Sequence, residues 1–432
     1  MLFEPSSPSG RTGLHPEAEE FSGPDNRGRM SRVQRRGVED MGLRTYILLL
    51  VVLTGLLIPS YGFAGAVEDG EAALEKGDHK AAYDIFLKAA EGGNAWAQAH
   101  LGQMYGEGQG VKQDHAASAK WYRYAADQDN EIALNNLAVL YATGQGVKQD
   151  LKEALRLYLR SAKKGYVIAQ NNVGAVYENG QGVEKDYQEA LTWYRRAAEQ
   201  GHSVSQNNIG SMYEHGRGVG QDFEEAMKWY ILAAGQGNAQ AQFNLGMMYA
   251  EGNGVPKDLK EAAGWYRLAA DQKYAQAAFN LAVFYSDGTG VVKDLKEAQR
   301  LYRLSADLKY APAQYNLGMM YLNGTGVRQD FKEALKWFKP AADQGYQPAQ
   351  HNLGTMHLNG DGVPRDYKEA AKWYRLAAES GDAEAQCTLA ELYARGLGVR
   401  KDRKEASRLA KEGYAAKGGN CRQVIDTYHL AK

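Results

Sequence analysis

A short loop of sequence Gly-x-Gly-Val returns nine times in this chain, each copy 36 residues after the one before, with no insertion or deletion. A fixed period of roughly 20 to 50 residues is typical of repeat arrays, whose units stack on their neighbours and bury a shared core. The first glycines of the nine loops are Gly108, Gly144, Gly180, Gly216, Gly252, Gly288, Gly324, Gly360 and Gly396. We therefore expect function to lie on an extended binding surface rather than in a catalytic pocket.

The first half of each unit predicts an amphipathic helix, here called helix A. Its apolar residues recur at helical spacing, as in the unit at residues 167–202. In that unit the stripe consists of Ala169, Val173, Val176 and Tyr177. Gly180 follows the stripe and suits a left-handed C-terminal cap, because glycine has no Cβ to clash there.

The second half of each unit predicts another helix, helix B, which opens at an aspartate. Asp186 stands three residues before Glu189, a spacing that favours a reciprocal capping box. An aspartate occupies this position in all nine units, and the glutamate is present in all but the first, where Ala117 stands. We interpret these acids as structural rather than catalytic. The predicted buried stripe of helix B consists of Ala190, Trp193, Tyr194, Ala197 and Ala198.

The ends of the array depart from the repeated pattern. Residues 67–94 predict a capping helix pair that resembles a tetratricopeptide unit, joined by a tight turn at Gly77 and Asp78. The units fill residues 95–418, and residues 419–432 predict a C-terminal capping helix. We expect an all-α solenoid of nine 36-residue helix-pair repeats with a cap at each end.

The apolar segment Ile47–Ile58 predicts a signal peptide. It is shorter than the ~20 residues of a membrane span, and its length suits the apolar centre of a leader sequence. Arg44 precedes it, and Ala64-Gly65-Ala66 resembles a cleavage site. We predict a signal peptide at residues 41–66 and export to the periplasm or the medium. The alternative is an uncleaved membrane anchor. Residues 1–40 predict a disordered extension, or translation starts at Met41.

The unit A-x-A-Q-x-N-L-G-x-M-Y-x-x-G-x-G-V-x-x-D-x-x-E-A-x-x-W-Y-x-x-A-A resembles the Sel-one-like repeat (SLR) family, a relative of the tetratricopeptide repeats, over residues 94–418. The resemblance implies a right-handed superhelix with helix A on its concave side. It also implies a non-enzymatic scaffold for protein complexes, like bacterial members that are exported and act in signalling, envelope biogenesis or host contact. A branch with a cysteine pair in each repeat is not matched here.

The composition and motifs argue against nucleic-acid binding and catalysis. The chain has 51 basic and 52 acidic residues, so a strongly cationic surface is not expected. Ser161 and Lys164 form an S-x-x-K pattern, but Ser161 occupies a small-residue column of helix B, and the partner motifs of such enzymes are absent from the sequence. The Gly-x-Gly loops follow helices rather than strands, so they are not phosphate-binding loops. We predict no enzyme, cofactor or metal site.

Two cysteines occur, one on the last helix A and one in the terminal helix. Cys387 and Cys421 would staple the C-terminal cap to the array if their Cα atoms approach within about 7 Å. The alternative is a pair of free buried thiols.

One column of helix A predicts the binding face. Its residues are Ala99, Asn135, Asn171, Asn207, Phe243, Phe279, Tyr315, His351 and Cys387. A second column, four residues further on, contributes Met247 and Met319 in the same part of the array. Aromatic and Met side chains are favoured at interface cores, so we predict a partner site over the fifth to eighth units. The alternative is that these rings shield the neighbouring repeat.

The residue after each member of the first column is usually asparagine. This ladder consists of Asn136, Asn172, Asn208, Asn244, Asn280, Asn316 and Asn352. Its amides would hold the backbone of an extended peptide, or they bond one repeat to the next.

The function expected is that of an exported, monomeric adaptor that binds a protein or peptide in a groove of helices A. One alternative is a carbohydrate- or envelope-binding scaffold, in which the aromatic rings stack on sugars. The other is a hydrolase or β-lactam-binding protein.

Overall fold

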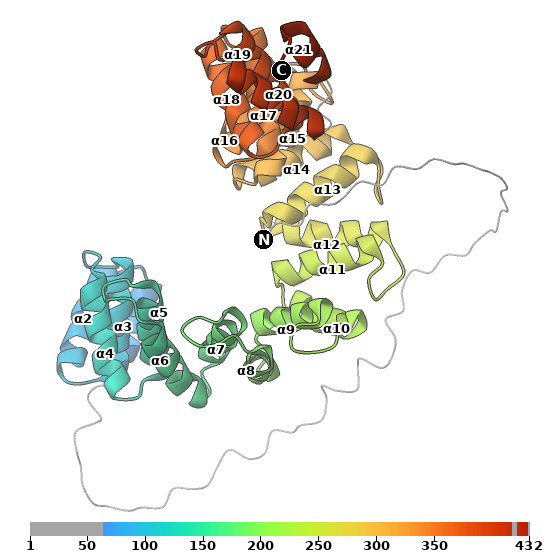
Figure 1. Cartoon of the computed structure of the whole chain (residues 1–432). Coiled ribbons are helices and arrows are strands. Elements are labelled where there is room, and N and C mark those ends of the chain that lie inside the picture. The colour runs from blue at the N-terminus through green and yellow to red at the C-terminus, as the bar shows by residue number, and fades with distance from the viewer. Residues whose placement is uncertain (1–63, 417–420, 431–432) are drawn as a thin grey trace, which may run out of the picture. The chain divides into compact units, whose positions relative to one another are not determined.

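The computed structural model of the chain describes residues 64–416 and 421–430. The expected extension at residues 1–40 and residues 41–63 of the expected signal peptide lie outside this part. The described residues form 21 helices and no strand, which confirms an all-α repeat fold. The helices follow one another in pairs along the chain (Figure 1). Within the described ranges no helix has the length and apolar character needed to cross a membrane.

Helices α2 to α20 are all 13 residues long, which reflects the strict period of the sequence. The first helix of each pair is α1 Ala64–Glu75, α3 Ala95–Glu107, α5 Glu131–Thr143, α7 Val167–Asn179, α9 Ser203–His215, α11 Ala239–Glu251, α13 Ala275–Asp287, α15 Ala311–Asn323, α17 Gln347–Asn359 and α19 Ala383–Arg395. The second helix is α2 His79–Glu91, α4 His115–Asp127, α6 Leu151–Lys163, α8 Tyr187–Glu199, α10 Phe223–Gly235, α12 Leu259–Asp271, α14 Leu295–Asp307, α16 Phe331–Asp343, α18 Tyr367–Glu379 and α20 Arg403–Ala415. The last helix of the described residues is α21 Cys421–Tyr428.

The core is continuous from one unit to the next. Each helix packs on the helices before and after it in the chain, and α21 packs on both α19 and α20. Small alanines bring the helices together, and one or two larger side chains per helix fill the remaining space. In one such cluster Tyr230 and Ala233 of α10 pack with Ala241, Leu245 and Met248 of α11, all nearly inaccessible to solvent. The solenoid is therefore a one-dimensional stack of hydrophobic layers.

The two glycines of each loop have separate roles. Gly288 ends α13 in the left-handed conformation, with φ of 80°, and its N–H donates to Phe284 O, as the sequence predicts for the first glycine. Gly290 also has a positive φ, of 68°. A Cβ on Gly290 would overlap the carbonyl group of Leu259, the first residue of α12. The second glycine thus lets the loop of one unit touch the helix B of the unit before it.

The aspartate that opens helix B caps it, but the expected reciprocal capping box is wrong. Asp186 Oδ1 accepts hydrogen bonds from the backbone N–H groups of Gln188 and Glu189, at 2.9 and 3.0 Å. The N–H of Asp186 donates to Tyr177 O at 3.0 Å, not to the glutamate. Glu189 Oε1 instead accepts from Trp193 Nε1 at 2.8 Å. The aspartate N–H is satisfied by the carbonyl nine residues back, at the end of helix A, so it is not available to the glutamate.

A glutamine pair clamps neighbouring units together in five places. Gln242 of α11 donates to Ala234 O of α10 at 3.3 Å and accepts from Gln272, which follows α12, at 2.8 Å. The clamp pairs are Gln98 with Gln128, Gln170 with Gln200, Gln206 with Gln236, Gln242 with Gln272, and Gln314 with Gln344. At the C-terminal end Ser380 stands where the second glutamine is expected, and Gln350 Oε1 is buried without a hydrogen-bond partner among the described residues.

Restoring the missing glutamine should stabilise this end of the array. We expect Ser380→Gln to raise the free energy of unfolding by about 1 kcal/mol, because a new amide donor would satisfy the buried Gln350 oxygen. Urea denaturation followed by circular dichroism measures the change. The reverse variant, Gln344→Ser, removes an existing clamp and should be destabilising by a similar amount. If Gln344→Ser destabilises the protein while Ser380→Gln leaves it unchanged, the interpretation of Ser380 is wrong.

Candidate functional site

The predicted site residues lie on four successive first helices. Phe243 is on α11, Phe279 on α13, Tyr315 on α15 and His351 on α17, and each side chain is half-buried. We call these four residues, together with Met247 and Met319, the helix-A strip. Its side chains are neither sealed in the core nor fully exposed, so each presents part of its surface to solvent.

Phe243, Phe279 and Tyr315 of the strip each contact two aromatic side chains of the chain segment that follows. The Phe243 centroid lies 5.8 Å from that of Tyr266 on α12 and 5.2 Å from that of Tyr274, which precedes α13. The arrangement recurs for Phe279 with Tyr302 at 5.8 Å and Tyr310 at 5.3 Å, and for Tyr315 with Phe338 at 5.7 Å and Tyr346 at 5.4 Å. Edge and tilted contacts at such distances are favourable, so the strip also joins one unit to the next.

Sequence reasoning missed the tyrosines that complete this surface. Tyr274, Tyr310 and Tyr346 are the residues just before α13, α15 and α17, and each is half-buried. The signal was present, because each aromatic residue of the strip is followed 31 residues later by one of them. Comparing two columns rather than one would have found the pairing.

The strip ends in a hydrogen-bonded histidine–aspartate pair rather than in a ring packed against two aromatic side chains. His351 Nδ1 lies 2.9 Å from Asp382 Oδ2, and the His351 ring meets the edge of Tyr374 at 5.6 Å. Burial alone would raise the pKa of Asp382, but hydrogen bonds from the Ala385 N–H and from His351, with the charge of that ring, hold the pKa below its usual value. Asp382 therefore stays ionised and holds the imidazole in place.

The two methionines of the strip lie beside the rings. Met247 packs at the edge of the core cluster that contains α12 and α13, and Met319 packs at the edge of the next cluster. Asn352 Nδ2 also contacts Met319 Sδ at 3.1 Å. Flexible thioethers next to fixed rings give a surface that adapts to different side chains of a partner.

The asparagine ladder bonds repeat to repeat in the described structure. Asn172 donates to Asn135 at 2.9 Å, and Asn244 donates to Asn207 at 3.0 Å. Asn208 bonds to Asn171 in the same way, at 3.2 Å. Asn280 and Asn316 hydrogen-bond to the hydroxyls of Tyr266 and Tyr302, a contact that Asn136 of the earlier units also makes, with Tyr122. Burial raises the pKa of Tyr266 to about 12, and the bond from Asn280 opposes this rise.

The last member of the column is covalently bonded. Cys387 of α19 and Cys421 of α21 form a disulfide with a Cα–Cα distance of 4.8 Å. Gly413 of α20 lies against both sulfur atoms, where a Cβ would come within 2.9 Å of Cys387 Sγ. The C-terminal helix is therefore stapled to the array through a site that has space only for glycine.

The serine of the S-x-x-K pattern has a structural partner. Ser161 is fully buried, and its hydroxyl donates to Glu131 O at 2.6 Å. Ser305, at the same position four units later, donates to Ala275 O at 2.7 Å. Both hydroxyls thus join helix B to the start of the helix A before it.

Comparisons with known proteins support the same architecture. Ten segments match the Sel1 repeat, at residues 63–94, 97–130, 132–166, 167–202, 203–238, 239–274, 275–310, 311–346, 347–382 and 383–416. No curated protein matches the chain significantly.

Two solved structures are similar over most of their length. One is a protective antigen of uropathogenic Escherichia coli strains that displays an SLR fold, with 31% identity over 86% of this chain and 88% of that chain, at a TM-score of 0.54. The other is a Sel1 repeat protein from Oxalobacter formigenes, with 33% identity over 71% of this chain and 89% of that chain, at a TM-score of 0.53.

Proposed function

Because this chain belongs to the Sel1 repeat family, we propose that it is an exported, monomeric, non-enzymatic adaptor that binds a protein or peptide on its helix-A strip. Sel1 repeats generally build non-catalytic scaffolds for protein interaction, and that coarse role applies to the chain as a whole. The observation that carries the finer proposal is the unbroken run of half-buried rings and thioethers over α11, α13, α15 and α17.

The composition of the strip suits a protein partner. Aromatic and Met side chains are enriched at the cores of protein interfaces, and a contiguous apolar patch on a soluble protein marks an interaction site. The rings are held in place on one side by their aromatic neighbours, so binding orders few rotatable bonds. In the first four units this column carries no ring, and its residues are Ala99, Asn135, Asn171 and Asn207. The proposed site is therefore restricted to the later units.

The disulfide supports export. A bond between Cys387 and Cys421 forms and persists in an oxidising compartment such as the periplasm, whereas cytosolic thiols are kept reduced. Together with the apolar segment Ile47–Ile58 it favours a location in the periplasm or outside the cell.

The triple variant Phe243→Asn, Phe279→Asn, Tyr315→Asn tests the strip. Asparagine is the residue that the array itself carries at this column in Asn135, Asn171 and Asn207, so the repeat-to-repeat bonds of the ladder can replace the ring contacts. We expect the variant to fold and to lose about tenfold or more in partner affinity, since buried aromatic anchors dominate interface energies. Cross-linking and pull-down from the envelope fraction, followed by titration of the partner that wild type enriches, measure the loss.

Circular dichroism and the urea midpoint of the same variant serve as the folding control. A variant that keeps its helicity and still captures the partner with wild-type affinity would place the binding surface elsewhere.

A further inference from the structure

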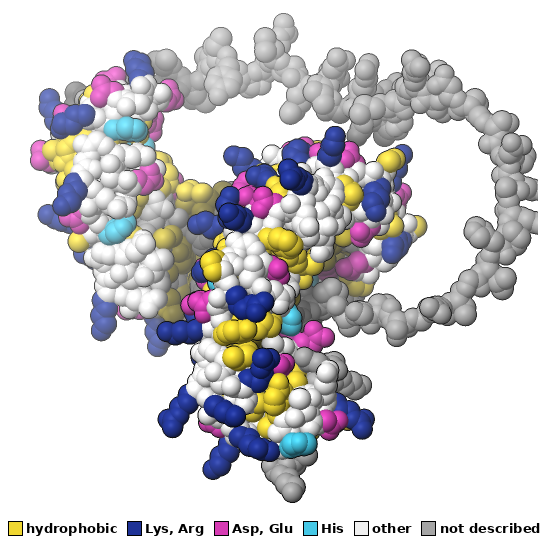
Figure 2. Space-filling view, turned by 90° about the horizontal axis from the view of Figure 1, so that it is seen from above, with side chains coloured by type: hydrophobic (Ala, Val, Ile, Leu, Met, Phe, Trp, Pro, Cys, Tyr) yellow, Lys and Arg dark blue, Asp and Glu magenta, His cyan; other side chains and the backbone are white. Residues whose placement is uncertain are grey.

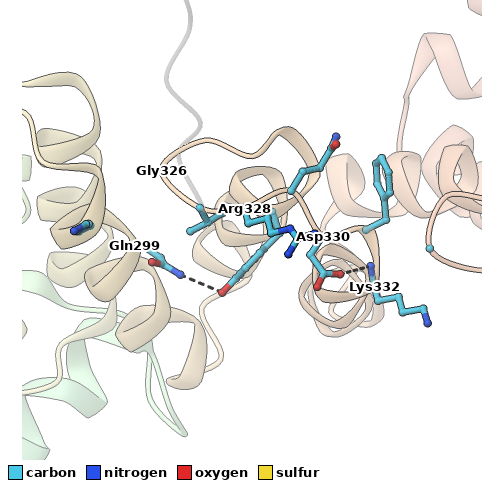
Figure 3. A pocket seen from close by; sticks show the side chains of 11 residues that line it. Gln299, Gly326, Arg328, Asp330 and Lys332 are labelled. Carbon is cyan, nitrogen blue, oxygen red and sulfur yellow. Dashed lines mark hydrogen bonds between the residues drawn. The ribbon is translucent and has the colours of Figure 1, made fainter.

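An open groove of about 1060 Å³ lies between α14, α16 and the loop that follows α15 (Figure 3). Its lining comes from α14, from Tyr321 near the end of α15, from the Gly-x-Gly-Val loop with Gly326, from the start of α16, and from Gly362 of the next loop. None of the helix-A strip residues lines it.

Three cations and one acid line the groove. Lys296 projects from α14, Arg328 from the loop and Lys332 from α16, and all three side chains are exposed. None of them forms an ion pair with any residue in the described part of the chain. The single acid, Asp330, caps α16, and its Oδ1 already accepts two backbone N–H groups at 2.9 and 3.0 Å.

The hydroxyl of Tyr321 in the same groove can act toward a ligand only as a hydrogen-bond donor. Tyr321 OH accepts a hydrogen bond from Gln299 Nε2 at 3.1 Å and another from Arg303 Nη2 at 2.7 Å. A phenol has two acceptor lone pairs and one donor hydrogen, so both lone pairs are filled. Within residues 64–416 and 421–430 no acceptor for the hydroxyl hydrogen is found. The groove therefore combines unpaired cations with an unpaired O–H donor.

We infer that this groove binds the carboxylates of an acidic segment of a partner protein. Three unpaired cations and an O–H donor favour an anionic ligand. They come from four segments, α14, α15, the loop and α16, which suits several carboxylates better than one compact ion. A phosphate would favour the backbone N–H groups at the start of α16, but Asp330 occupies them. Basic side chains are also prominent on the face of the molecule seen in Figure 2.

The groove one unit earlier provides a natural control. It has a volume of about 1140 Å³ and is lined at the same positions by Lys260, Tyr285 and Asp294. Val292 stands there in place of Arg328, and Ala263 in place of Gln299. The complete set of charged side chains in this earlier groove is Lys260, Arg267, Lys293, Asp258, Glu261 and Asp294, three cations against three acids. The groove at Gly326 is lined by three cations against one acid, and a smaller groove at Lys148 also has more cations than acids, with Arg123 and Lys148 against Asp150.

The experiment titrates the full-length chain with a fluorescein-labelled oligoglutamate peptide and follows fluorescence anisotropy at low and at physiological salt. Arg328→Val gives this groove the residue of its neighbour, and we expect it to weaken binding by about fivefold. The combined variant Lys296→Gln, Arg328→Val, Lys332→Gln should abolish binding. The gain-of-function variant Val292→Arg should create a second site and raise the stoichiometry. All four positions are exposed, so the fold is retained.

The inference is supported if the wild type binds oligoglutamate but not oligoglutamine, and if the combined variant no longer binds oligoglutamate. Binding that persists in the combined variant overturns it. Inorganic phosphate that displaces the peptide at equal concentration, with the same dependence on Arg328, would show that a phosphate group is the ligand and would also overturn it. Because the asparagine variant of the helix-A strip leaves this groove unchanged, failure of one proposal is distinguishable from failure of the other.

Discussion

Replacing Gly290 with alanine is expected to lower the free energy of unfolding by about 3 to 5 kcal/mol. Two costs add here. The residue has a φ of 68°, which a residue with a side chain adopts only with strain, and its Cβ would overlap the carbonyl of Leu259. Urea denaturation measures the total loss, and amide hydrogen exchange should locate it at the boundary between α12 and α14.

A glycine in the preceding unit is the matched control. Gly264 lies inside α12, where a Cβ would meet no heavy atom within 4 Å. Gly264→Ala should therefore stabilise the protein by about 0.5 to 1 kcal/mol, because alanine is the better helix former. The two substitutions make the same chemical change with opposite expected signs. A similar destabilisation from both would mean that the contact with Leu259 does not constrain the loop.

Loss of the disulfide is expected to release the C-terminal helix. Closing a loop between residues separated by 34 positions stabilises a protein by about 3 to 4 kcal/mol in the chain-entropy model. The double variant Cys387→Ala, Cys421→Ala should therefore lose amide protection over α21 and the adjoining part of α20, measured by hydrogen exchange with mass spectrometry. Chemical reduction of the wild type should give the same pattern.

Non-covalent contacts also hold α21 on the array, and they reduce the loss of protection expected without the disulfide. Val424 is buried against α19 and α20, and Ser407 donates to Leu430 O at 2.7 Å. Protection in α3 to α10 is the internal reference, since the staple contacts only the last units. If α21 keeps its full protection without the disulfide, these contacts suffice and the staple is dispensable for the fold.

Much of the fold could be predicted from single columns of the repeat. The left-handed cap at Gly288 and the aspartate cap at Asp186 follow from local backbone geometry, which one unit specifies on its own. The same holds for the buried stripe of helix B, including Trp193 and Tyr194. The strict period of 36 residues then predicts the stack.

What sequence reasoning missed depends on two columns at once. The role of Glu189 is set by Trp193 one turn later, whereas in the unit of Arg300 the corresponding glutamate, Glu297, forms an ion pair with that arginine. The glutamine clamps and the rings of the strip join residues about 30 positions apart, across the boundary of a unit. Comparing one repeat position across the units cannot reveal such pairs, because each pair joins residues at two different repeat positions.

Because each described helix packs mainly on its neighbours in the chain, α1 to α21 show no extensive contact between the two ends of the array that would fix its length. An interior unit of 36 residues has two packing surfaces, and each is complementary to the surface of the neighbouring unit. Gene duplication or in-frame deletion of such a segment would rejoin compatible surfaces. Evolution can therefore lengthen or shorten the reach of this molecule in whole modules while leaving the chemistry of every remaining module intact.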